Sequence, residues 1–374
     1  MIVYKTSIQK RKRNNMKEKT WDVHTLNNRL NYYQKLLTKA KTQEEKMALY
    51  KTIKSYQEFI STFHNRYKKP SFSYIAQADR NFFEKSIQTI SILLDANNYI
   101  VSNGINLTAE ASNIIVPKEK IITATNDFYN YIGGIYLERY NEYYQTGAIY
   151  IKFSKAANNK LGGDILIPEG VNEAFINVNS FNGLFDIATS VHEHGHAIGT
   201  SINKNHLRNP FVNEVETIFF ELLYLDTIDK NEYDFEEIKK AKAASIFIYN
   251  GYLNSIDFKY MTTLKGISDR KRAQEIIREK YELDADYIDG ELLYPLDNLV
   301  NYATSYLVAI ELFLLYKRNS YAALNILEQI IRIESYNEED ILNTLHNYGI
   351  IPGKNLKAFY KQYLNIKGTS KKLH

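Results

Sequence analysis

The sequence predicts a mainly α-helical fold that contains one small β section. In most of the chain, apolar residues recur at steps of three and four, the period of a helix with one buried face. Three short runs between residues 148 and 178 are instead rich in β-branched residues, as strands are. With 44% hydrophobic and 24% charged residues, the composition of the 374-residue chain is that of an ordinary globular protein.

The N-terminal third is predicted to be helical after a disordered tail. Residues 1–20 are polar and contain the basic cluster Lys10–Arg13, so we expect this segment to lack structure. We expect residues 21–125 to form an N-terminal helical region. Its elements are two antiparallel helices joined near Thr42, a helix over about 78–97, a loop or short strand over 98–117, and the start of a helix over 118–144.

The remaining residues, 126–374, are predicted to form the main region, in one compact unit with the preceding helices. No Gly-, Ser- or Pro-rich linker separates the two parts. The expected strands cover 148–153, 164–167 and 174–178, with Gly162 and Gly163 between the first two. A helix is expected from Leu184 to Ile202, followed by helices over 210–226, 235–263, 268–283, 296–317, 321–335 and 338–348.

The helix after the β section carries the pattern His-Glu-x-x-His at His192, Glu193 and His196. At 3.6 residues per turn the two histidines lie about 40° apart on one helix face, so both can bind one metal ion. Glu193 is then close enough to a metal-activated water to accept its proton. The pattern alone is weak, because five-residue matches arise by chance. Hydrolytic zinc sites use three protein ligands, so a third is required.

Glu214 is the favoured third ligand. It lies near the start of a predicted helix in which Asn209 is the expected N-cap and Pro210 the first residue. His194 is about 200° around the helix from His192 and is expected at the surface or behind the ligands. Ile202 occupies the position where the metzincin pattern has a third histidine. His206, in a predicted loop, stays open as an alternative.

Other candidate residues flank this centre. Glu221 is seven residues after Glu214, on the same helix face, and is expected either to accept the free N–H of a ligating histidine or to be a solvated surface carboxylate. Glu216 points elsewhere and is expected to be solvated. Tyr302 and Tyr306 are candidate donors to a developing oxyanion. An edge strand in the β section could pair with an extended peptide, although an ordinary hairpin over the core fits the pattern equally well.

The composition limits the classes of binding partner and the cellular compartment that we expect. A net charge of +4 on 374 residues offers little support for nucleic-acid binding. The apolar run at the start covers only Met1–Val3, which is too short for a signal peptide, and no stretch is judged long enough to span a bilayer. The chain has no cysteine, which excludes thiolate ligands and fits a reducing cytoplasm. We therefore expect a soluble cytoplasmic protein with no membrane partner, and make no prediction of its oligomeric state.

Beyond the individual motif, three segments together resemble the M3 family of zinc oligopeptidases, in particular the oligoendopeptidase F branch. They are Phe175–Asn179, His192–Ala197 and Phe211–Leu223. The resemblance covers about residues 147–353. It implies a helical zincin-like metallopeptidase fold, one zinc ion on His192, His196 and Glu214, and Glu193 as the catalytic glutamate. Tyr302, in Tyr302–Tyr306, then corresponds to a substrate-binding or transition-state tyrosine.

Two departures from the family pattern bear on substrate binding. Family members are commonly longer, so we expect much of the N-terminal helical lobe that narrows the channel to be missing. The family also places a histidine ahead of its tyrosines, whereas no histidine occurs between His206 and His346. Stabilisation of the transition state is then expected to depend on Tyr294 and Tyr302.

The resulting prediction is a zinc endopeptidase that cleaves internal bonds of short or flexible peptides. One alternative is a zinc carboxypeptidase of similar helical architecture. The other is a peptide-binding relative that keeps the fold and the metal but has little or no turnover.

Overall fold

The computed structural model describes eight segments of the chain. They are residues 19–65, 70–103, 114–154, 162–179, 183–203, 209–228, 232–281 and 292–364. The predicted N-terminal tail therefore lies outside the described residues, apart from its last two positions. The division at residue 125 stays a prediction.

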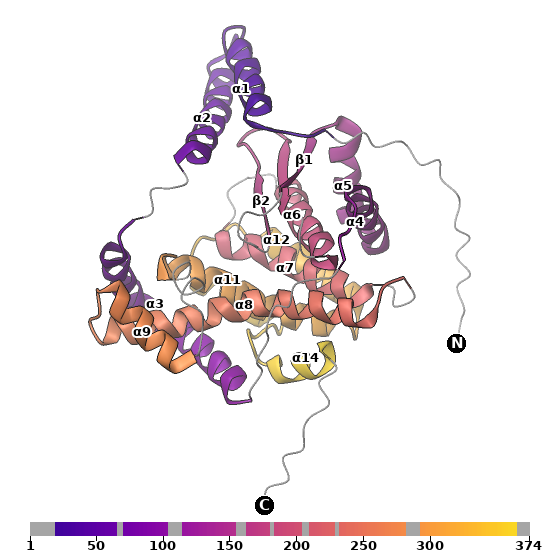
Figure 1. Ribbon diagram of the computed structural model, residues 1–374. Coiled ribbons are helices and arrows are strands. Elements are labelled where there is room, and N and C mark those ends of the chain that lie inside the picture. The colour runs from indigo at the N-terminus through magenta and orange to yellow at the C-terminus, as the bar shows by residue number, and fades with distance from the viewer. Residues whose placement is uncertain are drawn as a thin grey trace, which may run out of the picture.

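A helical hairpin, formed by α1 (Val23–Leu37) and α2 (Gln43–Asn65), stands at one end of the molecule above the sheet (Figure 1). Asp22 caps α1 by accepting a hydrogen bond from the Thr25 backbone N–H at 2.7 Å. Trp21 and Tyr56 pack against Phe175 of the sheet, and the Trp21 indole donates to a sheet carbonyl. The predicted pair of antiparallel helices is confirmed, and its buried face covers the sheet.

The sheet contains three strands, β1 (Ile149–Ser154), β2 (Gly163–Leu166) and β3 (Ala174–Asn179), in the order β1-β3-β2. β1 pairs with β3 in parallel, and β2 pairs with β3 antiparallel. One face, which includes Phe175, contacts the hairpin, whereas the other, which includes Ile176 and Val178, packs toward α6. The three predicted strands are confirmed, but their arrangement is not a simple hairpin.

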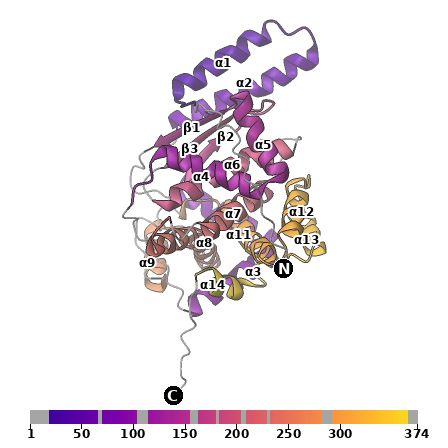
Figure 2. The same cartoon turned by 90° about the vertical axis from the view of Figure 1, so that its right-hand side faces the viewer.

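The body of the protein is helical (Figures 1 and 2). Its main helices are α6 (Leu184–Ile202), α7 (Pro210–Thr227), α8 (Phe235–Leu264) and α11 (Leu296–Tyr316). The other helices are α3 (Phe72–Ser102), α4 (Lys118–Ile132), α5 (Gly134–Thr146), α9 (Arg270–Tyr281), α12 (Ser320–Ile331), α13 (Glu338–Asn347) and α14 (Leu356–Tyr363). α6 packs along α7, and α7 packs along α11, so the predicted motif helix lies at the centre of the core.

The structure corrects the sequence-based prediction in three helical regions. The predicted helix over 118–144 is two helices, because Gly133 adopts a φ of 69° that turns the chain between α4 and α5. α3 extends to Ser102, so the first part of the predicted loop over 98–117 is helical. α14 was not predicted at all. Its short amphipathic pattern follows a Pro-Gly turn and gives a weak signal in the sequence.

α11 is the one helix in the described segments that is long and apolar enough to cross a membrane by length and composition. The prediction that no stretch reaches this length was therefore wrong. However, 78% of its apolar window is buried inside the protein, which is the pattern of a core helix.

A buried ion pair anchors the start of α11. Lys259 of α8 and Asp79 of α3 are 1% and 3% exposed, and Lys259 Nζ lies 2.5 Å from Asp79 Oδ2. Asp79 Oδ1 also accepts a hydrogen bond of 2.8 Å from the backbone N–H of Leu296. Removing one partner of such a pair leaves an uncompensated buried charge. Three helices therefore depend on this contact.

We expect Lys259→Met to lower the free energy of unfolding by about 3–5 kcal/mol, because Asp79 would lose its buried counter-charge. Urea denaturation followed by circular dichroism measures the change. Lys239→Met is the matched control, since Lys239 forms an exposed ion pair with Glu236 and lies over the exposed Phe235 ring, and its loss should change stability by less than about 1 kcal/mol. Equal stability of the two variants would contradict the assignment.

Candidate metal centre

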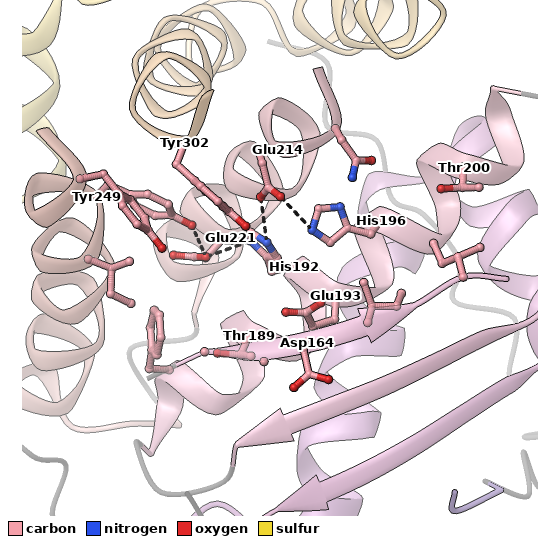
Figure 3. Close-up of a pocket in the computed structure, with 18 of the residues that line it drawn as sticks. Asp164, Thr189, His192, Glu193, His196, Thr200, Glu214, Glu221, Tyr249 and Tyr302 are labelled. Carbon is pink, nitrogen blue, oxygen red and sulfur yellow. Dashed lines mark hydrogen bonds and ion pairs between the residues drawn. The ribbon is translucent and has the colours of Figure 1, made fainter. Parts of the chain in front are cut away.

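A cavity of about 710 Å³ lies between the edge of the sheet and helices α6, α7, α8 and α11. The predicted residues His192, Glu193, His196, Glu214 and Tyr302 all line it. Figure 3 shows these side chains converging above β2 from α6, α7 and α11. The structure thus brings together five residues that are spread over 111 positions of the sequence, from 192 to 302 inclusive.

Three side chains present one possible ligand atom each, and these atoms all lie within 4.8 Å of one another. His192 Nε2 is 3.5 Å from Glu214 Oε2, and His196 Nε2 is 3.6 Å from Glu214 Oε1. Ligands about 2.0–2.2 Å from a tetrahedral zinc ion are separated by roughly 3.3–3.6 Å. The two histidine–carboxylate separations fall at the upper end of this range, so the three side chains form a candidate site for one metal ion.

Glu214 offers an independent test of this fit. Its Oε2 is buried and accepts no hydrogen bond, although buried carboxylate oxygens normally have a partner. The contact with His192 Nε2, at 3.5 Å, is too long to satisfy it. A cation between the three side chains would satisfy this oxygen. The donor set of two imidazoles and one carboxylate is also that of hydrolytic zinc sites.

The charges of the site are coupled. Burial raises the pKa of Glu214, but His196, His192 and the Tyr302 hydroxyl outweigh it and hold this pKa below its usual value. Burial lowers the pKa of His192, but Glu214, Glu221 and Glu193 together hold it well above the usual value. In the protein alone, one positive charge is thus favoured among these carboxylates. A bound metal ion would supply that charge and leave the imidazoles neutral.

Behind His192 lies a buried carboxylate, Glu221, which is 3% exposed. Its Oε2 lies 3.2 Å from His192 Nδ1 and accepts a hydrogen bond of 2.8 Å from the Tyr249 hydroxyl. Its Oε1 accepts a hydrogen bond of 2.5 Å from Ser245. Of the two predicted alternatives for Glu221, the solvated carboxylate is therefore wrong, and the side chain lies behind the candidate ligand His192. The sequence did not indicate Ser245 or Tyr249, because their helix passes the site without a recognisable motif.

Glu193 lies on the cavity side of α6, beside β2, and is 5% exposed. Burial raises the pKa of Glu193 to about 8, with the histidine next to it acting in the opposite direction. Gly163 of β2 lies directly against it. A Cβ on Gly163 would come within 2.8 Å of Glu193 Oε1 and 2.6 Å of the Asn177 carbonyl oxygen, so only glycine fits there.

The predicted tyrosines separate into two groups. Tyr302 lines the cavity and stacks on Tyr252, with ring centroids 4.8 Å apart. Negative charge on Glu214 and then burial raise the pKa of Tyr302, so it is a hydrogen-bond donor at neutral pH. Tyr294 also lines the cavity and is 44% exposed. Tyr306 does not line it. This side chain lies behind the wall, bonded to Tyr360 and stacked on Tyr249.

Two further polar side chains near the site are buried, and for His194 this excludes the surface alternative. His194 is 1% exposed, with Nδ1 2.7 Å from the Ser190 carbonyl oxygen and Nε2 3.2 Å from the Tyr144 hydroxyl. Burial lowers its pKa to about 4, so it is a neutral core histidine. Glu216 is fully buried, which corrects the expected solvated position. The reason is that α7 is enclosed on all sides, so its polar positions do not mark a solvent face. His206 lies outside the described residues.

No protein-family model matches the sequence, and no curated protein matches it. Among solved structures, the protein named PZ peptidase A, in complex with an inhibitor, has a TM-score of 0.53 and 14% identity, over 78% of this chain and 58% of that one. A protein provisionally named oligoendopeptidase F has a TM-score of 0.53 and 12% identity, over 90% of this chain and 66% of that one.

The fold is shared with these peptidases. A further protein, from Bacillus anthracis and also provisionally named oligoendopeptidase F, has a TM-score of 0.49 and 13% identity. This chain covers 65% of that protein's length. The likeness to the two structures with a TM-score of 0.53 confirms the predicted mainly helical fold with its small sheet. At this level of identity, similarity of fold does not extend to activity.

We expect Glu214→Ala to lose bound zinc, because two histidines alone leave the tetrahedral site short of a ligand. Glu221→Gln should keep one ion but bind it about 10–100-fold more weakly, since it only orients His192. Elemental analysis and competition with a chelating dye measure the two effects. The control is His346→Ala, which removes an exposed histidine on α13. Full metal occupancy in Glu214→Ala would exclude Glu214 as a ligand.

Proposed function

We propose that this protein is a zinc metallopeptidase that hydrolyses internal bonds of short or flexible peptides. The observation that carries the proposal is the convergence of His192, His196 and Glu214 beside Glu193, in a cavity bounded by the free edge of β2. This combination supplies a metal site, a base and a backbone to which an extended peptide can pair. We also propose a cytoplasmic location, on the basis of the absence of cysteine.

Each group has a proposed role in the reaction. A zinc ion on His192, His196 and Glu214 would polarise the peptide carbonyl and lower the pKa of a water molecule. The positive charge of the zinc ion would lower the pKa of Glu193 below its value of about 8 in the protein alone, so that the carboxylate can accept the proton from the attacking water and later donate it to the leaving amine. Its position against Gly163 brings the base next to any peptide that pairs with β2.

Tyr302 is the proposed oxyanion donor. Its hydroxyl keeps its proton at neutral pH and already lies within hydrogen-bonding reach of Glu214. The same hydroxyl can donate instead to the oxygen of a tetrahedral intermediate, where negative charge develops. Tyr252, stacked on its ring, restricts its movement.

The lining favours an endopeptidase over a carboxypeptidase. A lysine or arginine is a strong partner for the free C-terminal carboxylate that a carboxypeptidase recognises. Among the described residues that line the cavity, none is lysine or arginine. The substrate carboxylate would also meet Glu193 and Asp164 nearby, and like charges repel.

We expect Glu193→Gln to lower kcat at least about 100-fold, because general-base catalysis contributes that much or more. The variant should keep the metal content of the parent, since Glu193 is not a ligand. Cleavage of a quenched fluorescent peptide library, alongside elemental analysis, measures both. If the parent retains zinc and binds peptides but cleaves none, the protein is a peptide-binding relative and the peptidase proposal fails.

Mass spectrometry of the products distinguishes an endopeptidase from a carboxypeptidase. An endopeptidase should cut internal bonds of C-terminally amidated peptides as fast as those of the free acids, because it does not recognise the terminus. A carboxypeptidase should produce stepwise ladders from free acids and leave amides intact. Ladders from the free acids alone would replace the endopeptidase proposal with the carboxypeptidase.

A further inference from the structure

The outer edge of β2 forms one wall of the cavity and is available for pairing. β2 lies at the end of the strand order β1-β3-β2, and no other strand in the described part of the chain pairs with its outer side. The Asn179 N–H donates to the Gly162 carbonyl at 3.2 Å. Hydrogen-bonded residues alternate along an antiparallel ladder, so Gly162 and Asp164 bond to β3. Gly163 and Ile165 therefore direct their backbone groups to the free edge.

This alternation sets the register of a paired peptide. A peptide residue bonded to Gly163 lies beside Glu193, because Gly163 is in close contact with that carboxylate. The adjacent peptide residue then stands opposite Asp164. In an antiparallel pairing this is a non-hydrogen-bonded position, where opposing Cβ atoms are only about 4.5–5.5 Å apart. The side chain opposite Asp164 thus belongs to a residue next to the cleaved bond.

Asp164 is held in place for such a contact. Its Oδ2 accepts a hydrogen bond of 3.2 Å from Asn177 Nδ2 on the neighbouring strand, and Asn177 in turn accepts one of 2.6 Å from Ser154. Asp164 lines the cavity, and its charge contributes to the field at Glu193. Figure 3 shows it directly below Glu193, at the strand edge.

The other residues that line the cavity also favour a positively charged ligand. The chain carries 47 lysines and arginines, but none of them is among the described residues that line the cavity. Five carboxylates line it: Asp164, Glu169, Glu193, Glu214 and Glu221. Because the pKa of Glu193 is raised to about 8, the other four carboxylates and one divalent ion give the lining a formal charge of −2. Tyrosine rings, including Tyr252 and Tyr294, also line the cavity, and the faces of such rings attract cations.

We infer that Asp164 selects a lysine or arginine side chain at the substrate residue next to the cleaved bond, so that the substrates are cationic peptides. The inference builds on the proposed peptidase function, because it assigns the specificity of the same cavity. Glu169 is a weaker candidate for this role, since it lies at the rim, 46% exposed, and faces Lys51 at 3.5 Å.

Binding to a protein that cannot turn over tests the inference. Fluorescent octapeptides that carry a single Lys, Gln or Glu at each position in turn are titrated into zinc-loaded Glu193→Gln protein. Their dissociation constants are measured by fluorescence anisotropy. At one position, Lys should bind up to about fivefold more tightly than Gln, and Glu more weakly, as for an opposite-charge cross-strand pair. The difference should shrink as salt is raised.

Substitutions at Asp164 assign the effect to this residue. In the same background, Asp164→Asn keeps the hydrogen bond from Asn177 and should abolish the preference for Lys. Asp164→Lys should reverse it in favour of Glu. Glu339→Gln, which removes an exposed carboxylate on α13 outside the lining, should leave it unchanged. Thermal melting confirms that each variant is folded, and Asp164→Ser replaces Asp164→Asn if that variant is not.

The outcomes separate this inference from the proposed function. Equal binding of the Lys, Gln and Glu peptides, or a Lys preference that survives Asp164→Asn, overturns the inference. Either result leaves the peptidase proposal intact if the parent cleaves peptides. A Lys preference that depends on Asp164, in a protein that cleaves nothing, supports the selection and overturns only the peptidase function.

Discussion

The close packing of α6 against α7 is the constraint on which the candidate site depends. Two ligands come from one helix and the third from the other, so their spacing is the spacing of the helices. Gly195 permits the approach, because a Cβ there would lie 3.0 Å from Thr217 Cγ2 and 3.4 Å from Phe220. Metal ligands must be placed within about 0.2 Å of their ideal distances. A larger side chain at Gly195 would therefore disturb the site as well as the core.

Two tyrosine hydroxyl groups, from α4 and α5, also hold α6 in place. Tyr129 of α4 donates to the Val191 carbonyl at 2.8 Å, and Tyr143 of α5 donates to the Ala197 carbonyl at 3.1 Å. Burial raises the pKa of both tyrosines well above neutrality, so they keep the proton that they donate. These bonds flank His192 and His196 along the helix. Together with Glu221 behind His192, they hold the imidazoles before any metal binds, which reduces the entropy lost on binding.

The cavity concentrates negative charge in a protein whose overall charge is +4. Burial, with smaller contributions from the neighbouring carboxylates, raises the pKa of Glu193 to about 8. A metal ion relieves part of this repulsion at Glu214, and a cationic peptide would relieve more at Asp164. The same electrostatic field would favour a bound metal ion and the inferred cationic substrates, and would disfavour a free C-terminus.

The sequence by itself determined the local features of this protein. Helical periodicity predicted nearly all the helices, and β-branched runs predicted the three strands, because both patterns reflect which side of an element is buried. The spacing of His192 and His196 follows from the helix repeat alone, and Asn209 and Pro210 marked the start of α7 as predicted.

Only the tertiary structure decided what surrounds those features. It placed Glu214 opposite the histidines, buried His194 and Glu216, moved Tyr306 behind the cavity wall, and set Asp164 on a free edge beside Glu193. These outcomes depend on contacts between segments far apart in the chain, and a single residue pattern does not encode such contacts. The polarity of Glu216 in particular gave a wrong prediction of its exposure. α7 is enclosed on all sides, so this helix buries its charged residues along with its apolar ones.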